Sequence, residues 1–309
     1  MFSKTSGEAI AVIKGEDRPN KILYITDDRD DELDIDYDNI DDDFYKAVTK
    51  SKTKNKMMSP IEITKLKYYL SKNVQPFDED DRNIYDLKRS EITDRNKYEI
   101  NLPHGEHFEL MPPIQESQRI AIAGMTGSGK SYQTAAYIQK YHHIHKKNKI
   151  FMFSMHETDP AYDDLDYIVR IDISEENILN TKLDIVFLHD SLCIFDDTDN
   201  IQNKKVSDAI DKLISDILAN GRHHDISAII CLHQICNYKK TKPILADISG
   251  TLLFLNGSKY NVCRYLKCYA GLDQKQIKKI TSLKSRWFYI SLVQPMYVLS
   301  EYKAFIIKD

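Results

Sequence analysis

The stretch from Gly124 to Ser131, GMTGSGKS, has the spacing of glycine, lysine and serine that can bind phosphate. Its glycines allow a tight turn that directs backbone N–H groups toward phosphate oxygens. We expect Lys130 to reach the β- and γ-phosphates of ATP and the Ser131 hydroxyl to bind Mg²⁺. An apolar run leads into Gly124 and a helical pattern begins at Ser131, which is the context that such a P-loop requires. The predicted nucleotide-binding residues are Gly124, Met125, Thr126, Gly127, Ser128, Gly129, Lys130 and Ser131.

Two acids end a second apolar run, LCIFDD. A magnesium–triphosphate site needs a carboxylate at the tip of a buried strand close to the P-loop, and Asp196 has that position. Two ionised carboxylates at the end of such a strand would be costly to bury without a cation. We therefore predict that Asp196 binds Mg²⁺ and that Asp197 is the general base for the attacking water.

A third run, ISAIICLHQ, ends in Gln234. A polar side chain at that strand end can sense the γ-phosphate or orient the attacking water. Before this run lies NGRHHD, in which Arg222 follows the expected end of a helix. Arg222 can pair locally, or it can act as an arginine finger at the nucleotide of a neighbouring subunit.

Residues 237–286 contain 11 Lys and Arg but only two acids. This segment is either a solvated basic face or a track for the phosphate backbone of nucleic acid, and several tyrosines lie within it. On the second interpretation Lys239, Lys240 and Lys242 are the candidate DNA contacts.

Short apolar runs alternate with helical stretches after about residue 101, which predicts an α/β fold with a mainly parallel sheet and helices on both faces. We expect helices over residues 131–145 and 204–219, and two more strands after Trp287. The expected strands cover residues 119–124, 149–154, 166–172, 191–197, 226–234 and 251–257.

The first part of the chain differs in charge from the rest. Residues 1–110 contain 18 basic and 25 acidic residues, and 11 of the 17 residues from Asp27 to Asp43 are acidic. Self-repulsion disfavours a packed element in that acidic stretch, so we expect it to be mobile. We predict an accessory region over residues 1–105 and a P-loop ATPase domain over residues 106–309.

Several classes of protein are not supported by the composition. The N-terminus has no apolar core of a secretory signal, and no run approaches the roughly 18 apolar residues of a membrane span. Five cysteines without a CxxC pair do not indicate a disulfide framework or a zinc site. We expect an intracellular, soluble protein without a membrane span.

The P-loop, the IFDD strand end, NGRHHDISAII and the strand-terminal Gln234 together resemble the FtsK–HerA superfamily. They are most similar to the DNA-packaging ATPases of large double-stranded DNA viruses, the poxvirus-type branch. The closing segment PMYVLSEYKAFII resembles the end of that branch as well. The resemblance covers roughly residues 105–309, and many members of the wider superfamily have Glu where Asp197 stands.

The resemblance implies a RecA-like core that works in a homo-oligomeric ring, usually a hexamer, and moves double-stranded DNA by Mg²⁺-dependent ATP hydrolysis. It implies packaging of a viral genome into a capsid, with capsid proteins as further partners, in the host cytoplasm at assembly sites or in the virion. Lys130, Ser131 and Asp196 would keep the roles given above, Gln234 would be the sensor and Arg222 the trans-acting arginine. Alternatives are a DNA helicase or segregation pump, a P-loop kinase, and a nucleotide-gated scaffold.

Overall fold

The fold is that of a computed structural model of the 309-residue chain. The structure describes residues 1–15, 19–26, 44, 47–48, 56–96, 98–174, 177–178, 184–236, 241–255 and 259–307. The acidic segment Asp27–Asp43 lies outside the described residues, so its predicted mobility stays a prediction.

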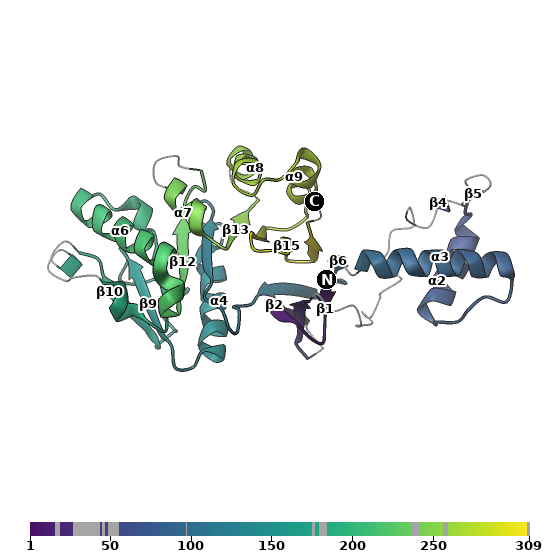
Figure 1. Cartoon of the computed structure of the whole chain (residues 1–309), viewed down its shortest axis with the longest axis horizontal. Coiled ribbons are helices and arrows are strands. Elements are labelled where there is room, and N and C mark those ends of the chain that lie inside the picture. Colours follow the sequence, from purple (N-terminus) through teal and green to yellow (C-terminus); the bar gives the residue numbers. More distant parts are fainter. Residues whose placement is uncertain are drawn as a thin grey trace.

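A ten-stranded sheet forms the main body within the described residues, in the order β10-β9-β11-β12-β8-β13-β14-β15-β16-β6 (Figure 1). The first six strands in that order are parallel and the last four are antiparallel to their neighbours. The α/β prediction with a mainly parallel sheet is confirmed. The strands are β10 (Ile168–Asp172), β9 (Lys149–Ser154), β11 (Ser191–Asp196), β12 (Ile226–Leu232), β8 (Arg119–Ala123), β13 (Gly250–Phe254), β14 (Trp287–Ser291), β15 (Tyr297–Ser300), β16 (Lys303–Ile306) and β6 (Glu99–Asn101).

Alternate residues of the central strands enter two different cores. In β11, Cys193 and Phe195 pack with the helices of one face, whereas Leu192 and Ile194 pack with α4 on the other. Because both faces are covered, these strands are apolar along nearly their whole length. Helices therefore lie on both faces of the sheet, as predicted.

The helices that cover the sheet follow its strands along the chain. One face carries α4 (Lys130–Ile144), and the other carries α6 (Lys204–Asn220), α7 (Thr241–Asp247), α8 (Lys259–Cys268) and α9 (Gln274–Thr281). The predicted helices over residues 131–145 and 204–219 are confirmed to within one residue at each end. Short 3₁₀ helices are η1 (Ile185–Leu188), η2 (Thr198–Asn200) and η3 (Gly221–His224).

The chain after Trp287 forms three strands, β14, β15 and β16, where two were expected. The chain reverses direction between β14 and β15 and again between Ser300 and Lys303. In the second turn the Ser300 hydroxyl donates to the Lys303 carbonyl at 2.8 Å. All three strands pair antiparallel, since each is joined to the next by a short connection that cannot hold a crossover helix.

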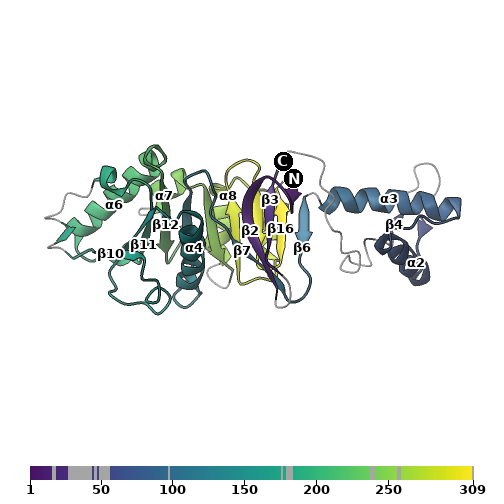
Figure 2. The same ribbon diagram turned by 90° about the horizontal axis from the view of Figure 1, so that it is seen from below.

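A second, four-stranded antiparallel sheet packs over this antiparallel part of the main sheet, as Figure 2 shows. Its order is β1-β3-β2-β7, and its buried residues share one core with β14, β15 and α4. The strands are β1 (Phe2–Ser3), β2 (Glu8–Gly15), β3 (Lys21–Ile25) and β7 (Glu106–Leu110).

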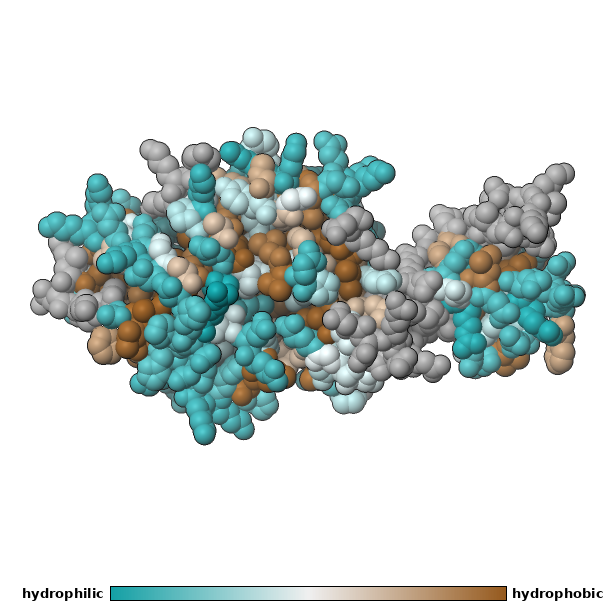
Figure 3. All heavy atoms as spheres, in the orientation of Figure 1, coloured by the Kyte–Doolittle hydropathy of each residue, from teal (hydrophilic) through white to brown (hydrophobic). Residues whose placement is uncertain are grey.

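A helical hairpin extends from the other side of β6 (Figures 1 and 2). Helix α2 (Pro60–Ser71) begins with a capping box between Ser59 and Glu62, and α3 (Glu79–Asn96) runs back toward the sheet. The pair has a small core of its own that includes Leu66, Leu70 and Tyr85. Its described surface is mainly hydrophilic in Figure 3. Two further short strands, β4 (Ala47–Val48) and β5 (Lys56–Met57), pair with each other.

The division predicted at residue 105 separates two adjacent strands that belong to different sheets. Strand β6, before it, pairs with β16 in the main sheet, and β7, after it, pairs with β2 in the small sheet. The accessory region and the ATPase domain therefore exchange strands, and the division itself stays a proposal. Among the described residues, no helix is both long and apolar enough to cross a membrane.

Candidate nucleotide-binding site

The P-loop joins the end of β8 to the start of α4, as the sequence predicts. Gly127 and Gly129 have φ angles of 76° and 104°, in the left-handed region that favours glycine. Helix α4 begins at Lys130, so its free N–H groups and positive dipole end face the loop. This is the arrangement that binds phosphate in P-loop proteins.

Close packing beneath the loop explains why position 124 needs a glycine. A Cβ at this position would lie 2.5 Å from the Ser128 hydroxyl and 2.8 Å from the Phe254 ring. Phe254 is the last residue of β13 and is itself buried. The P-loop therefore lies directly on the end of the neighbouring strand, and a larger residue at 124 would displace it.

Lys130 is buried and points back into the loop. Its Nζ donates to the Gly124 carbonyl at 3.0 Å and to the Met125 carbonyl at 3.5 Å. The ammonium group is thus held within the curve of the loop, where a phosphate bound by the loop amides would meet a positive charge.

The acid strand lies two positions from the P-loop strand. Strand β12 separates β8 from β11, and all three run parallel, so their carboxyl ends share one edge of the sheet. Asp196 ends β11 and is buried, and Asp197 follows it at the surface of the same edge. The structure therefore brings Asp196 and Asp197 to the edge that carries the P-loop.

Burial raises the pKa of the Asp196 carboxyl, and the carboxylate of Asp197 raises it further. The ammonium of Lys130 acts in the opposite direction, which places the two groups within electrostatic reach. A buried carboxylate of this kind needs a cation to stay ionised at low cost. The oxygens of Asp196 and Ser131 are the hard ligands that Mg²⁺ prefers.

Tyr162 completes this corner of the site and was not found from the sequence. It is buried, and its pKa is raised first by burial and then by the neighbouring Cys231 and Asp196. Ser131 and Thr134 lie next to its hydroxyl, but neither makes a hydrogen bond of good geometry with it, nor does any other described residue. A buried, unsatisfied oxygen beside Ser131 and Asp196 fits a site that holds a hydrated Mg²⁺. Tyr162 lies in the loop between β9 and β10, where no motif marks it.

Asp197 adopts a left-handed backbone conformation, with φ 54° and ψ 22°. One carboxylate oxygen lies 3.4 Å from Nε2 of His233 and the other lies 3.5 Å from Nε2 of His156. His233 also contacts Asp199 at 3.0 Å. Sequence reasoning missed both histidines and Asp199, although His233 directly precedes Gln234 and Asp199 closes the run DDTD.

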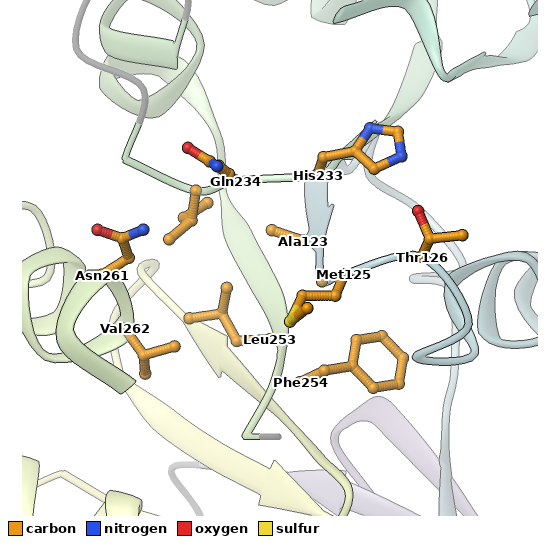
Figure 4. Close-up of a pocket in the computed structure, with 11 residues that line it drawn as sticks. Ala123, Met125, Thr126, His233, Gln234, Leu253, Phe254, Asn261 and Val262 are labelled. Carbon is orange, nitrogen blue, oxygen red and sulfur yellow. The ribbon is translucent and has the colours of Figure 1, made fainter. Parts of the chain in front are cut away.

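Gln234 follows His233 at the carboxyl end of β12, beside the start of the P-loop. It is exposed and lines a pocket of about 470 Å³ with Met125, Phe254 and Asn261 (Figure 4). The start of the P-loop, the end of β12, the end of β13 and α8 surround this pocket. Gln234 is therefore next to the loop, but its role as a γ-phosphate sensor stays a prediction.

Arg222 lies apart from this edge, and two of the predicted DNA contacts lie outside the described residues. Arg222 is exposed in η3, which precedes β12 at the opposite end of that strand. Lys242 is exposed in the first turn of α7. Lys239 and Lys240 lie outside the described residues, so the proposed set of DNA contacts is untested.

Comparisons with known proteins give relatives but no family model that matches the chain. Among solved structures, the genome packaging NTPase B204 of Sulfolobus turreted icosahedral virus 2 is 17% identical, with a TM-score of 0.42 over 63% of this chain and 97% of B204. The cytoplasmic domain of the type VII secretion ATPase EccC of Thermomonospora curvata is 12% identical, with a TM-score of 0.48 over 67% of this chain and 29% of that chain.

A curated relative is the uncharacterized protein V3 of the Sputnik virophage. It is 34% identical over 214 residues, which are 69% of this chain and 86% of V3. That identity over most of V3 is enough to establish common descent, and the chain belongs to the same protein family as virophage V3.

Proposed function

We propose that the protein is a Mg²⁺-dependent ATPase of the FtsK–HerA type that translocates double-stranded DNA, most specifically during packaging of a viral genome into a capsid. The observation that supports it best is the meeting of the P-loop Gly124–Ser131 with Asp196 and Asp197 at one sheet edge, with β12 between them. Nucleotide binding follows from the loop, and hydrolysis requires the acids.

Each group of the site has a distinct task in this proposal. The P-loop amides and Lys130 would bind the phosphates and stabilise the charge that develops on the γ-phosphoryl group. Ser131 and Asp196 would hold Mg²⁺, which when bound neutralises phosphate charge. The carboxylate of Asp197 would accept the proton of the attacking water, as a general base does.

Helices α8 and α9 support the proposal that DNA is the partner. Asn261 and Val262 of α8 line the pocket beside the P-loop. The exposed side of the same two helices carries basic residues, namely Lys259, Arg264, Lys267, Lys275 and Lys278. A short helix that contacts the nucleotide edge on one side and offers cations on the other can transmit a change at the site to a phosphate backbone.

The ATPase rate of the full chain with and without duplex DNA tests this function. We expect Mg²⁺-dependent hydrolysis that duplex DNA stimulates, and binding that weakens steeply with salt because phosphate contacts release counterions. Lys130→Ala should reduce the rate about 10²–10³-fold, since it removes a charge from the transition state.

The outcomes separate the two parts of the proposal. Hydrolysis that is indifferent to DNA, together with no DNA binding by the assembled protein, would leave an ATPase and remove the translocase. Near-normal hydrolysis by Lys130→Ala would remove the P-loop assignment. Phosphate transfer to a small acceptor would instead identify a kinase.

A further inference from the structure

Three short segments meet at the exposed side of the acid strand. The chain turns sharply after β11 because Asp197 is in the left-handed conformation, and η2 then brings Asp199 to the end of β12. His233 is the first residue after β12 and lies between the two acids. The left-handed turn at Asp197 is therefore what places both carboxylates against one imidazole ring.

The Asp199 carboxylate contacts both the backbone and the ring of His233. The backbone N–H of His233 donates to one Asp199 oxygen at 3.1 Å, and ring Nδ1 lies 3.0 Å from the other. The side chains of His233 and Asp199 are 26% and 20% exposed, so water competes only partly for these contacts. The backbone contact anchors the Asp199 carboxylate beside His233, and its other oxygen then holds ring Nδ1.

With Nδ1 turned to Asp199, the opposite ring nitrogen must face Asp197. Nε2 of His233 lies 3.4 Å from Oδ1 of Asp197. The second histidine, His156, lies at a similar distance, but its side chain is 65% exposed and its contact is correspondingly weak. Of the two histidines that contact the Asp197 carboxylate, His233 is therefore the one whose ring is fixed in place.

The contact between His233 and Asp197 matters for the site because of where β12 lies in the sheet. Because β12 lies between β8 and β11, the residue after it adjoins both the P-loop and the acids. His233 lines the pocket with Met125 and Thr126 while it contacts Asp197. Figure 4 shows its ring on the side of Thr126, whereas the next side chain, Gln234, lies on the side of Asn261.

We propose that His233 is a positioning residue for hydrolysis: fixed by Asp199, its ring orients the Asp197 carboxylate toward the water that attacks the γ-phosphate. The inference rests on the proposed ATPase function. His233, the residue that follows β12, makes the contact with the catalytic acid Asp197. Asp199 is the residue that holds its ring.

Substitutions at His233 can separate the two ring nitrogens. His233→Ala should lower kcat for ATP about 10–100-fold and leave the Kd for nucleotide within about twofold, because the base is misoriented while the phosphate cradle is intact. His233→Gln should recover part of the rate, since its terminal amide reaches the place of Nε2. His233→Asn reaches only the place of Nδ1 and should stay close to His233→Ala.

Asp199 provides an independent test. Asp199→Asn should lower kcat without changing nucleotide affinity, and the double variant with His233→Ala should be no slower than His233→Ala alone, because both act through one contact. The matched control is His189→Ala. It removes another His–Asp contact, in which Nδ1 of His189 lies 2.9 Å from Oδ2 of Asp190, at the opposite end of β11. That variant should hydrolyse ATP like the parent protein.

The results separate the role of His233 from the proposed ATPase function. A parent protein without ATP turnover would remove the proposed function. A parent protein that turns over, with His233→Ala equally fast or with additive Asp199 and His233 effects, would overturn the inference alone. Equal losses of kcat and nucleotide affinity in a variant that keeps the parent melting temperature would assign His233 to binding and also overturn it.

Discussion

At the scale of single residues, the two adjacent acids of the strand end experience different surroundings. Asp196 is buried beside Ser131, Tyr162 and Lys130, whereas Asp197 is partly exposed between two histidines. The left-handed backbone at Asp197 separates the two carboxylates, because it reverses the chain immediately after β11. This geometry supports one role as metal ligand and another as base.

The two roles predict different losses on substitution. Asp196→Asn should abolish the Mg²⁺ dependence of nucleotide binding, because a neutral amide is a poorer ligand for a hard cation. Asp197→Asn should keep Mg²⁺-dependent ATP binding and lose about 10²–10⁴-fold in turnover, as expected for a missing general base. Nucleotide titration with and without Mg²⁺, followed by single-turnover hydrolysis, measures both. Two variants that bind and hydrolyse alike would contradict the division.

At the scale of elements, the edge strand β6 ties the N-terminal region to the main sheet. Glu99 at its start receives Lys279 of α9 at 2.7 Å and Lys303 of β16 at 2.6 Å. Burial alone would raise the pKa of Glu99, but the hydrogen bonds and charges of the two lysines outweigh it and lower the pKa from 4.5 to about 2. One carboxylate thus joins an edge strand, its neighbour and a covering helix.

This contact predicts a pH-dependent contribution to stability. Because the pKa of Glu99 is lower in the folded chain than in the unfolded chain, the contribution is complete above about pH 4.5 and is lost as pH falls toward 2. Glu99→Gln should lower the free energy of unfolding at neutral pH by roughly 1–3 kcal/mol and remove that part of the acid sensitivity. Denaturant unfolding at several pH values measures it.

The control for Glu99 is Asp247→Asn, which changes an exposed acid at the end of α7. It should leave the free energy of unfolding and its pH dependence close to those of the parent chain. A Glu99→Gln variant that unfolds like this control at every pH would show that β6 is held by backbone pairing alone.

At the scale of the whole molecule, Arg222 and the P-loop lie at opposite ends of the sheet. Arg222 precedes β12, and the nucleotide edge lies at the other end of this seven-residue strand. At about 3.3 Å per residue this separation is roughly 20 Å, beyond the reach of an arginine side chain. A nucleotide on which Arg222 acts must therefore belong to a neighbouring subunit, as the arginine-finger alternative requires.

Mixing two inactive variants tests this arrangement. Arg222→Ala should bind ATP normally and hydrolyse it slowly, and Lys130→Ala should be inactive in its own pocket. Mixed assemblies should regain activity, because an intact pocket of one subunit can meet an intact Arg222 of the next. The rate is measured as a function of the mixing ratio. Mixed assemblies that stay inactive would assign Arg222 to a structural role.

Sequence alone determined the parts of this protein that depend on near neighbours in the chain. The P-loop Gly124–Ser131 needs only a strand, a turn and a helix in succession, and each leaves its own pattern of glycine and apolar spacing. The central strands were predictable for the same reason, since burial on both faces makes each of them an apolar run. The third strand after Trp287 was missed because no Gly, Pro, Asn or Asp marks the turn between β15 and β16.

Only the tertiary structure decided which polar residues meet. Tyr162 reaches Ser131 and Asp196 from a loop without a motif, and His233 lies beside Asp197 and Asp199 because β12 is next to β11 in the sheet. The exchange of β6 and β7 between the two sheets likewise depends on pairing with distant strands. Such contacts follow from strand order and from the direction of each turn, neither of which a local pattern of side chains specifies.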